Sequence, residues 1–175
     1  MSRQRQQRRE ADYYPTPRHA IDALLDAYPP PTWDVLEPAA GEGAIVQALL
    51  EREYRVHAVE LRQECYSALA SLTERVVIGD WLELSRYPDV WPRPLSIVTN
   101  PPFSIAREFA TACLSVGVVY VALLLRVNVE AANPWRSFWE AHPWTQRVPL
   151  WRRPSFTGRG TDACNYIWAI WMKED

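Results

Sequence analysis

The segment TNPPF, residues 99–103, combines residue types that suit chemistry on a planar amine. Two prolines fix their φ angles and donate no backbone hydrogen bond, so the loop is rigid and its carbonyl oxygens stay available as acceptors. Asn100 adds a side-chain carbonyl, and Phe103 offers a ring face. Two acceptors beside an aromatic face would hold an NH2 group whose own ring stacks on Phe103. The alternative is a Pro-Pro turn that ends in a core phenylalanine.

The chemistry that such a clamp favours is direct transfer of a group to an exocyclic amine. An aromatic amine is a poor nucleophile because its lone pair is delocalised into the ring. Acceptors that bind its hydrogens favour a pyramidal nitrogen and expose the lone pair, which is preorganised electrostatic help. We therefore predict catalytic roles for four consecutive residues, Asn100, Pro101, Pro102 and Phe103.

A glycine-containing loop that begins with an acidic residue precedes this segment in the chain. It reads EPAAGEG and contains Glu37, Gly41 and Gly43. Glycine lets the backbone approach a ligand where a side chain would clash. A carboxylate at this position would repel a phosphate and suits a ligand that carries a positive charge. An ordinary tight turn is the alternative.

Two further apolar runs also end on an acidic residue. Glu60 follows Gly41 by about 20 residues, the offset of the carboxylate that accepts hydrogen bonds from ribose hydroxyls in dinucleotide-type folds. Its alternative role is that of an acid at a helix N-terminus. In the segment GDW, Asp80 would accept a hydrogen bond from an adenine amine or cap a helix, and Trp81 would stack on the ring. Together, the acidic residues at the ends of three strands indicate a ligand-binding site more strongly than any one of them does.

Strands and helices that alternate with short connections must position these residues. Apolar runs predict strands at 33–39, 54–60, 75–80, 94–100, 118–127, 145–151 and 164–172, and helical periodicity predicts helices at 18–27, 44–52, 62–72, 104–116 and 134–141. The pattern predicts an α/β fold: a mostly parallel seven-stranded sheet with helices on both faces and an antiparallel C-terminal hairpin. In such a sheet, ligands bind beyond the carboxyl ends of the strands, where the candidate residues stand.

Composition predicts one soluble, cytoplasmic domain without a metal centre. The 175 residues are 48% hydrophobic and 23% charged and contain no apolar run long enough to span a membrane. We expect a disordered basic arm at 1–12 and a single domain at 13–175. The three cysteines and three histidines have no metal-ligand spacing, so structural thiols are expected.

The charges are segregated along the chain, although the net charge is only −2. Such a net charge excludes a uniformly basic coat. Arginines are nevertheless frequent in the first ten residues and between 126 and 160, whereas acids concentrate between 22 and 90. The segregation suits a molecule with one face toward an anion, and a solvated surface explains it equally well.

In the order and completeness of these motifs, residues 13–171 resemble the S-adenosylmethionine-dependent amino-methyltransferases of class I fold, which are Rossmann-like. The likeness is greatest to the small adenine-N6 DNA methyltransferases of phages and prophages, because NPPF matches their [DNS]PP[YFW] motif. It implies S-adenosyl-L-methionine as the cofactor. The cofactor-binding residues that it implies are Tyr14, Thr16, Pro17, Glu37, Ala39, Gly41, Gly43, Glu60, Asp80, Trp81 and Asn100.

The resemblance also implies a nucleic-acid substrate, with DNA preferred to RNA. The late segments RRPSF and GTDACNYIWAIW look like the part that lies over the target base, so Phe156 is expected to pack against the base and Asp162 to position it. Arg152 and Arg153 would hold phosphates, and a tryptophan such as Trp135 or Trp151 would lie near the substrate. The target base must be flipped out or single-stranded.

Three alternatives for the function stay open at this stage. RNA adenine-N6 enzymes share the motif. Glutamine methyltransferases of release factors carry a similar NPP-aromatic loop, and a glutamine side chain presents the same planar NH2 group. A non-catalytic module that keeps the fold is the third alternative. The basic arm favours nucleic acid over protein, and no feature of the sequence indicates a membrane partner.

Overall fold

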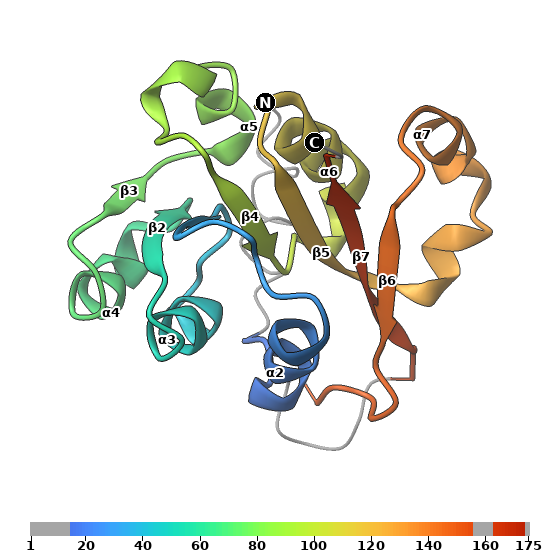
Figure 1. Ribbon diagram of the computed structural model, residues 1–175, viewed down its shortest axis with the longest axis horizontal. Helices are drawn as coiled ribbons and strands as arrows, with labels where there is room; N and C mark the ends of the chain where they lie inside the picture. The colour runs from blue at the N-terminus through green and yellow to red at the C-terminus, as the bar shows by residue number, and fades with distance from the viewer. Residues whose placement is uncertain (1–14, 156–162, 174–175) are drawn as a thin grey trace.

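The computed structural model describes residues 15–155 and 163–173, which form a sheet covered by helices on both faces (Figure 1). Seven strands in this part of the chain have the order β3-β2-β1-β4-β5-β7-β6. Strands β1 to β5 are parallel to one another, and β7 is antiparallel to both β5 and β6. The predicted α/β sheet with an antiparallel C-terminal hairpin is confirmed. Its strands are β1 Asp34–Glu37, β2 Arg55–Glu60, β3 Val76–Ile78, β4 Ser96–Thr99, β5 Tyr120–Arg126, β6 Gln146–Pro149 and β7 Tyr166–Met172.

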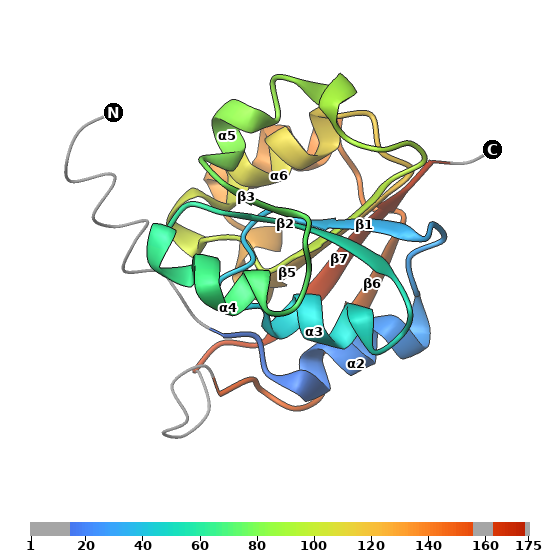
Figure 2. The ribbon, with the colours of Figure 1, turned by 90° about the vertical axis from the view of Figure 1, so that its left-hand side faces the viewer.

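The helices divide between the two faces of the sheet (Figures 1 and 2). One face carries α2 Arg18–Ala27, α3 Ala44–Leu50 and α4 Tyr66–Ala70, and the other carries α5 Trp81–Leu84, α6 Ala106–Ser115 and α7 Arg136–Ala141. The five predicted helices are present, several of them shorter than expected because their first turns are 3-10 helices. The short helix α5 has no periodicity that could predict it, since it is a single turn, and only the alternative role of Asp80 as a helix cap indicates it.

The two faces of the sheet bury separate hydrophobic clusters. Along β5, the side chains of Tyr120, Ala122 and Leu124 belong to one cluster, and those between them belong to the other. Successive side chains of a strand point to opposite faces, so a strand covered on both sides must be apolar at nearly every position. This is why residues 118–127 read as a continuous apolar run.

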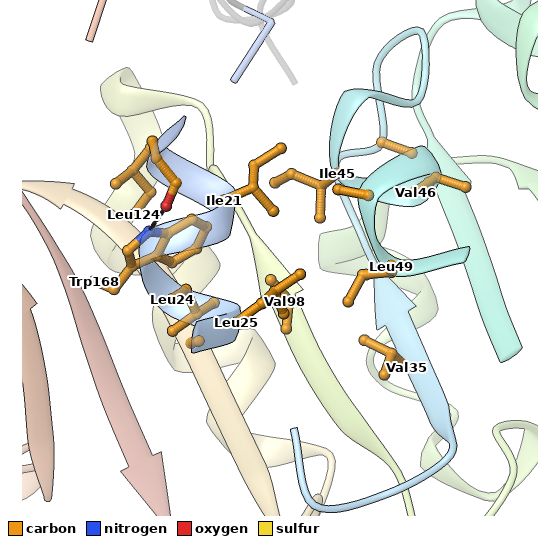
Figure 3. Close-up of a cluster of buried hydrophobic side chains, with 14 of the residues drawn as sticks. Ile21, Leu24, Leu25, Val35, Ile45, Val46, Leu49, Val98, Leu124 and Trp168 are labelled. Atoms are coloured by element: carbon orange, nitrogen blue, oxygen red, sulfur yellow. Dashed lines mark hydrogen bonds between the residues drawn. The ribbon is translucent and has the colours of Figure 1, made fainter. Parts of the chain in front are cut away.

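Helix α2, the first helix of the described residues, packs on the sheet beside β7, the last strand in the chain. Figure 3 shows Ile21, Leu24 and Leu25 of α2 packed among side chains of the sheet and of α3. The buried indole of Trp168 in β7 donates a hydrogen bond from Nε1 to the carbonyl oxygen of Ala20, at 2.7 Å. Segments from the two ends of the described chain therefore stabilise one another.

Cys65 and Cys113 are buried free thiols. Burial raises the pKa of the Cys113 thiol, which keeps it protonated and unreactive. Among residues 15–155 and 163–173, no group of histidine, cysteine and acidic side chains could hold a metal ion. Over the same residues, no helix has both the length and the apolar character needed to cross a bilayer.

Candidate active site

A pocket opens at the carboxyl ends of β1, β2 and β4, with about 760 Å³ of space between its atoms when the open mouth is included. Seven of the residues predicted for the site line the pocket: Thr16, Glu37, Ala39, Glu60, Trp81, Asn100 and Pro102. The topology explains their meeting, because parallel strands end at the same edge of the sheet.

Glu37 is the last residue of β1, and its carboxyl group lies almost fully buried in the pocket wall, at 1% exposure. Its Oε1 accepts a hydrogen bond from the Ala39 N–H at 3.0 Å. Burial raises the pKa of Glu37 to about 8, although the nearby Thr99 hydroxyl and the Ala39 N–H partly oppose the shift. The pocket thus holds a carboxyl group that a positive charge would readily ionise.

The loop between β1 and α3 is held in place by the second acid, Glu60. The Gly41 N–H donates to Glu60 Oε2 at 2.7 Å, and the Ala40 N–H donates to the Val59 carbonyl at 2.9 Å. Gly43 adopts a φ of +95°, a conformation that side chains disfavour, and it forms the N-cap of α3. Gly41 and Gly43 shape the loop but are not among the residues that line the pocket. The small side chains of Ala39 and Ala40 line it instead.

Glu60 also binds Arg62, for which the sequence predicts no role. Glu60 Oε1 accepts hydrogen bonds from the Arg62 backbone N–H at 2.9 Å and from its Nε at 3.0 Å. A carboxylate offers about four acceptor positions, so three protein donors leave room for one from a ligand. Arg62 lines the pocket beside Glu60 and could have been suspected from its position two residues after the strand-end acid.

The structure places Asp80 and Trp81 differently relative to the pocket, and Asp80 has the helix-capping role that was its alternative. Asp80 is the N-cap of α5 and accepts a hydrogen bond from the Leu82 N–H at 3.0 Å, and it is not among the residues that line the pocket. Trp81 does line the pocket, but only 1% of it is exposed, and its ring packs 5.8 Å from that of Trp91. Its indole is therefore part of the pocket wall and of the core at the same time.

The NPPF loop begins where β4 ends at Thr99. Asn100 and Pro102 line the pocket, and Pro101 is buried. The carbonyl oxygen of Pro102 accepts a hydrogen bond from the Ile105 N–H at 3.1 Å, which starts the short 3-10 helix Phe103–Ile105. The expectation that both proline carbonyls stay open is therefore wrong for Pro102, because the chain turns into a helix immediately after it.

The ring of Phe103 is half-buried and lies between two side chains from the neighbouring strands rather than in the pocket wall. The Arg126 guanidinium lies over the ring, 4.4 Å from its centroid, and the Tyr166 ring lies at 5.7 Å. Arg126 Nε in turn donates to the Tyr166 hydroxyl at 3.0 Å. These three side chains form an aromatic and cationic border next to the pocket.

The remaining predicted residues lie at the margins or outside the described residues. Pro17 precedes α2 and accepts a hydrogen bond from the Ala20 N–H at 2.9 Å. Arg152 and Arg153 are exposed after β6, where Trp151 is 95% exposed. Trp135 is buried against Phe138 and Trp139, so it cannot stack on a substrate. The structure does not describe the basic arm at 1–12, Tyr14, Phe156 or Asp162.

Several other residues line the pocket, and their residue types alone do not indicate a functional role. They are Pro15, Pro38, Ala40, Ala44, Ile45, Leu61, Gly79 and Phe109. Pro38 and Ala40 lie inside the loop that the sequence pattern singles out. Phe109 comes from α6 and appears in the sequence only as one of its apolar positions, so no motif could have identified it.

Comparison with known proteins shows which fold this arrangement belongs to. No protein-family model matches the chain. The ribosomal RNA small subunit methyltransferase A of Erythrobacter litoralis is 34% identical over 77 residues, which are 41% of this chain and 27% of that protein. The match thus spans about a quarter of the relative's length.

Two solved structures have the same architecture at low sequence identity. The 23S rRNA methyltransferase ErmE superposes with a TM-score of 0.69 at 17% identity, over 93% of this chain and 71% of that chain. An O-methyltransferase from Bacillus cereus, in complex with SAH, superposes with a TM-score of 0.65 at 15% identity, over 90% and 82% of the two chains. The chain therefore has the Rossmann-like fold of the class I methyltransferases.

Proposed function

We propose that this protein is an S-adenosyl-L-methionine-dependent methyltransferase that methylates the exocyclic N6 amine of an adenine in nucleic acid. One observation carries the proposal: the same pocket is lined by the buried carboxyl group of Glu37 and by Asn100 of the NPPF loop. A site for a cationic cofactor and a clamp for a planar amine are thus adjacent.

The described residues fit this cofactor. Bound in the pocket, S-adenosyl-L-methionine would supply an activated methyl group on a positively charged sulfur. Glu37 offers the compensating negative charge, because a carboxyl group with a pKa of about 8 ionises readily beside a cation. Glu60 has an acceptor position for a ribose hydroxyl, and Ala39 and Ala40 allow close approach of a ligand to the loop.

The NPPF loop would position the acceptor amine. Asn100 Oδ1 and the Pro101 carbonyl would accept hydrogen bonds from the amine, which exposes its lone pair toward the pocket. Alignment of that nitrogen with the methyl group supplies much of the rate. No general base is required, since the nitrogen becomes strongly acidic on methylation and releases its proton to water.

The kind of nucleic acid is the part of the proposal on which the sequence and the relatives differ. The phage-type motif in the sequence favours DNA. Two of the three similar proteins named above are ribosomal RNA methyltransferases, so RNA is at least as well supported as DNA. DNA and RNA present the same adenine amine. We therefore propose nucleic acid as the substrate class, and RNA is the first substrate to test.

Transfer of labelled methyl groups to RNA, single-stranded DNA, duplex DNA and protein extract tests the proposal. We expect labelled N6-methyladenine after digestion of one of the nucleic acids. The Asn100→Ala variant is the control for a contaminating activity. Label on glutamine would replace the proposed substrate, and binding of cofactor without any labelled product would contradict the proposed activity.

A further inference from the structure

We propose that the substrate is an unpaired strand and that Trp151 stacks on a base next to the target. Trp151, Arg152 and Arg153, which we call the stacking platform, lie at the same edge of the sheet as the NPPF loop. The inference rests on the proposed function and names the form of nucleic acid that the same site would accept.

The stacking platform follows β6 at the carboxyl edge of the sheet, the edge where the NPPF loop follows β4. The Leu150 N–H donates to the Tyr166 carbonyl at 3.0 Å, which holds the chain beside β7 just before Trp151. Arg153, two residues after Trp151, donates a hydrogen bond from Nε to Asn165 Oδ1 at 2.9 Å. The platform is thus held on both sides of Trp151, by Tyr166 at the start of β7 and by Asn165, which directly precedes it.

Tyr166 connects the stacking platform with the catalytic loop. Its ring lies 5.7 Å from that of Phe103, and its hydroxyl accepts a hydrogen bond from Arg126. The Arg126 guanidinium covers the Phe103 ring at 4.4 Å. A strand that presents a base to the NPPF loop would therefore pass Arg126, which packs on the buried Tyr166, and reach Trp151 with a nearby nucleotide.

Trp151 is exposed to a degree that is unusual for its type. At 95% exposure, it leaves nearly its whole indole in water, although single exposed hydrophobic residues are by themselves common. Its surroundings distinguish it: Arg152 and Arg153 are also exposed, and residues 141–155 and 163–173 contain no aspartate or glutamate. An exposed ring beside two exposed arginines matches a nucleic-acid strand, which offers both phosphates and ring faces.

Stacking selects an unpaired strand. In a duplex, the ring faces of the bases are covered by their neighbours, so a tryptophan outside the helix finds only backbone. In a single strand, every base has an accessible face, and alanine substitution of a stacking aromatic costs about 1–3 kcal/mol per base. Arginines alone would hold a duplex and a single strand through the phosphates.

Binding of two matched oligonucleotides, one single-stranded and one duplex, tests the inference. The single strand carries one adenine flanked by 2-aminopurine, whose fluorescence is quenched by stacking. We expect Trp151→Ala to weaken binding of the single strand by about 5- to 100-fold and to abolish the quenching, with little effect on the duplex. Trp151→Phe should keep most of the affinity.

Trp33→Ala is the matched control, because Trp33 is 66% exposed but precedes β1 at the opposite edge of the sheet. It should leave both affinities unchanged. Unchanged single-strand binding in Trp151→Ala, or an equal loss for the duplex, would overturn the inference. Melting temperature verifies that each variant is folded.

The inference and the proposed function fail in different ways. If wild-type protein methylates adenine but Trp151→Ala binds and methylates the single strand equally well, the stacking platform is wrong and the enzyme activity stands. If Trp151 proves essential for single-strand binding and no methyl transfer is found, the binding surface stands and the proposed function fails.

Discussion

At the scale of single residues, one buried carboxyl group controls the charge of the pocket. With a pKa of about 8, Glu37 is mostly protonated at neutral pH in the free protein. A positively charged ligand beside it favours the carboxylate and lowers that pKa. Binding below pH 8 therefore releases a proton, and affinity should rise with pH up to about 8 and then level off.

Glu37→Gln tests this coupling with nearly the same shape. We expect affinity for S-adenosyl-L-methionine to fall about 10- to 100-fold at pH 8, because a charge-assisted contact is lost. The rise of affinity between pH 6 and pH 8 should disappear as well. Calorimetry at three pH values measures both effects, and the product S-adenosylhomocysteine, which lacks the positive charge on sulfur, is the control ligand. An equal loss for both ligands would show that Glu37 acts through the loop structure instead.

The same substitution has a predictable effect on stability. The pKa of Glu37 is raised in the folded protein from 4.5 to about 8, so its contribution to the free energy of unfolding is full below pH 4.5 and is lost as the pH rises through 8. Ligand-free Glu37→Gln should therefore gain stability over the wild type at pH 8 relative to pH 5. Urea unfolding of both proteins at the two pH values measures the difference.

Asn100 separates binding of the cofactor from binding of the target. We expect Asn100→Ala to lower kcat by at least about 100-fold, the usual loss when one preorganised polar contact in the transition state is removed. Cofactor affinity should change little, because Glu37 and Glu60 remain. Steady-state kinetics and calorimetry on the same variant measure the two quantities. Asn100→Asp keeps an acceptor and should recover part of the activity, and a parallel loss of cofactor binding would contradict the role.

At the scale of elements, the turn from β1 into α3 is the part of the site that tolerates least change. Gly43 has a φ of +95°, and a Cβ built on it would lie 2.5 Å from Leu72 Cδ1 and 3.3 Å from Leu69 Cδ2. Both leucines pack in the core around α3 and α4. The turn is therefore restricted by backbone conformation and by packing together.

Gly43→Ala should lower the free energy of unfolding by about 2–3 kcal/mol, the sum of backbone strain and repacking. Gly117→Ala is the matched control, since Gly117 has a φ of +71° and, apart from its chain neighbours, no atom of the described residues lies within 4 Å of the point that its Cβ would occupy. Strain alone should cost it about 1 kcal/mol. Urea unfolding of both variants measures the difference, and equal losses would show that Leu69 and Leu72 move aside freely.

At the scale of the whole molecule, the pocket is assembled from segments that are distant in the sequence. Pro15, Glu60 and Phe109 line the same space, and they come from the start of the described chain, from β2 and from α6. A ligand that contacts all of these segments binds the folded chain and has no site in the unfolded one. Its binding energy therefore adds to the stability of the whole fold.

Saturation with S-adenosyl-L-methionine should raise the melting temperature. At 100 times the dissociation constant, a ligand adds about 2.7 kcal/mol, which is about 5–10 °C for a domain of this size. Thermal unfolding over a range of cofactor concentrations measures the shift. ATP, which shares the adenosine part but carries negative charge, is the control and should shift the melting temperature much less.

The sequence alone was sufficient for the order of the elements and for the edge of the sheet that carries the site. Continuous apolar runs reveal strands buried on both faces, and acids, glycines and the NPPF segment mark their carboxyl ends. These signals are local, because each depends on residues within a few positions of one another. The four-residue helix α5 and the helical turn after Pro102 are too short to show the periodicity from which a helix is predicted.

Only the tertiary structure decided how exposed each candidate side chain is. The sequence treats Trp135 and Trp151 alike, yet α7 buries the first against its neighbours and β6 leaves the second in solvent. Likewise, Glu37 is enclosed and acquires a raised pKa, whereas Asp80 caps a helix. Burial and charge environment depend on segments that are remote in the chain, and packing alone brings those segments together.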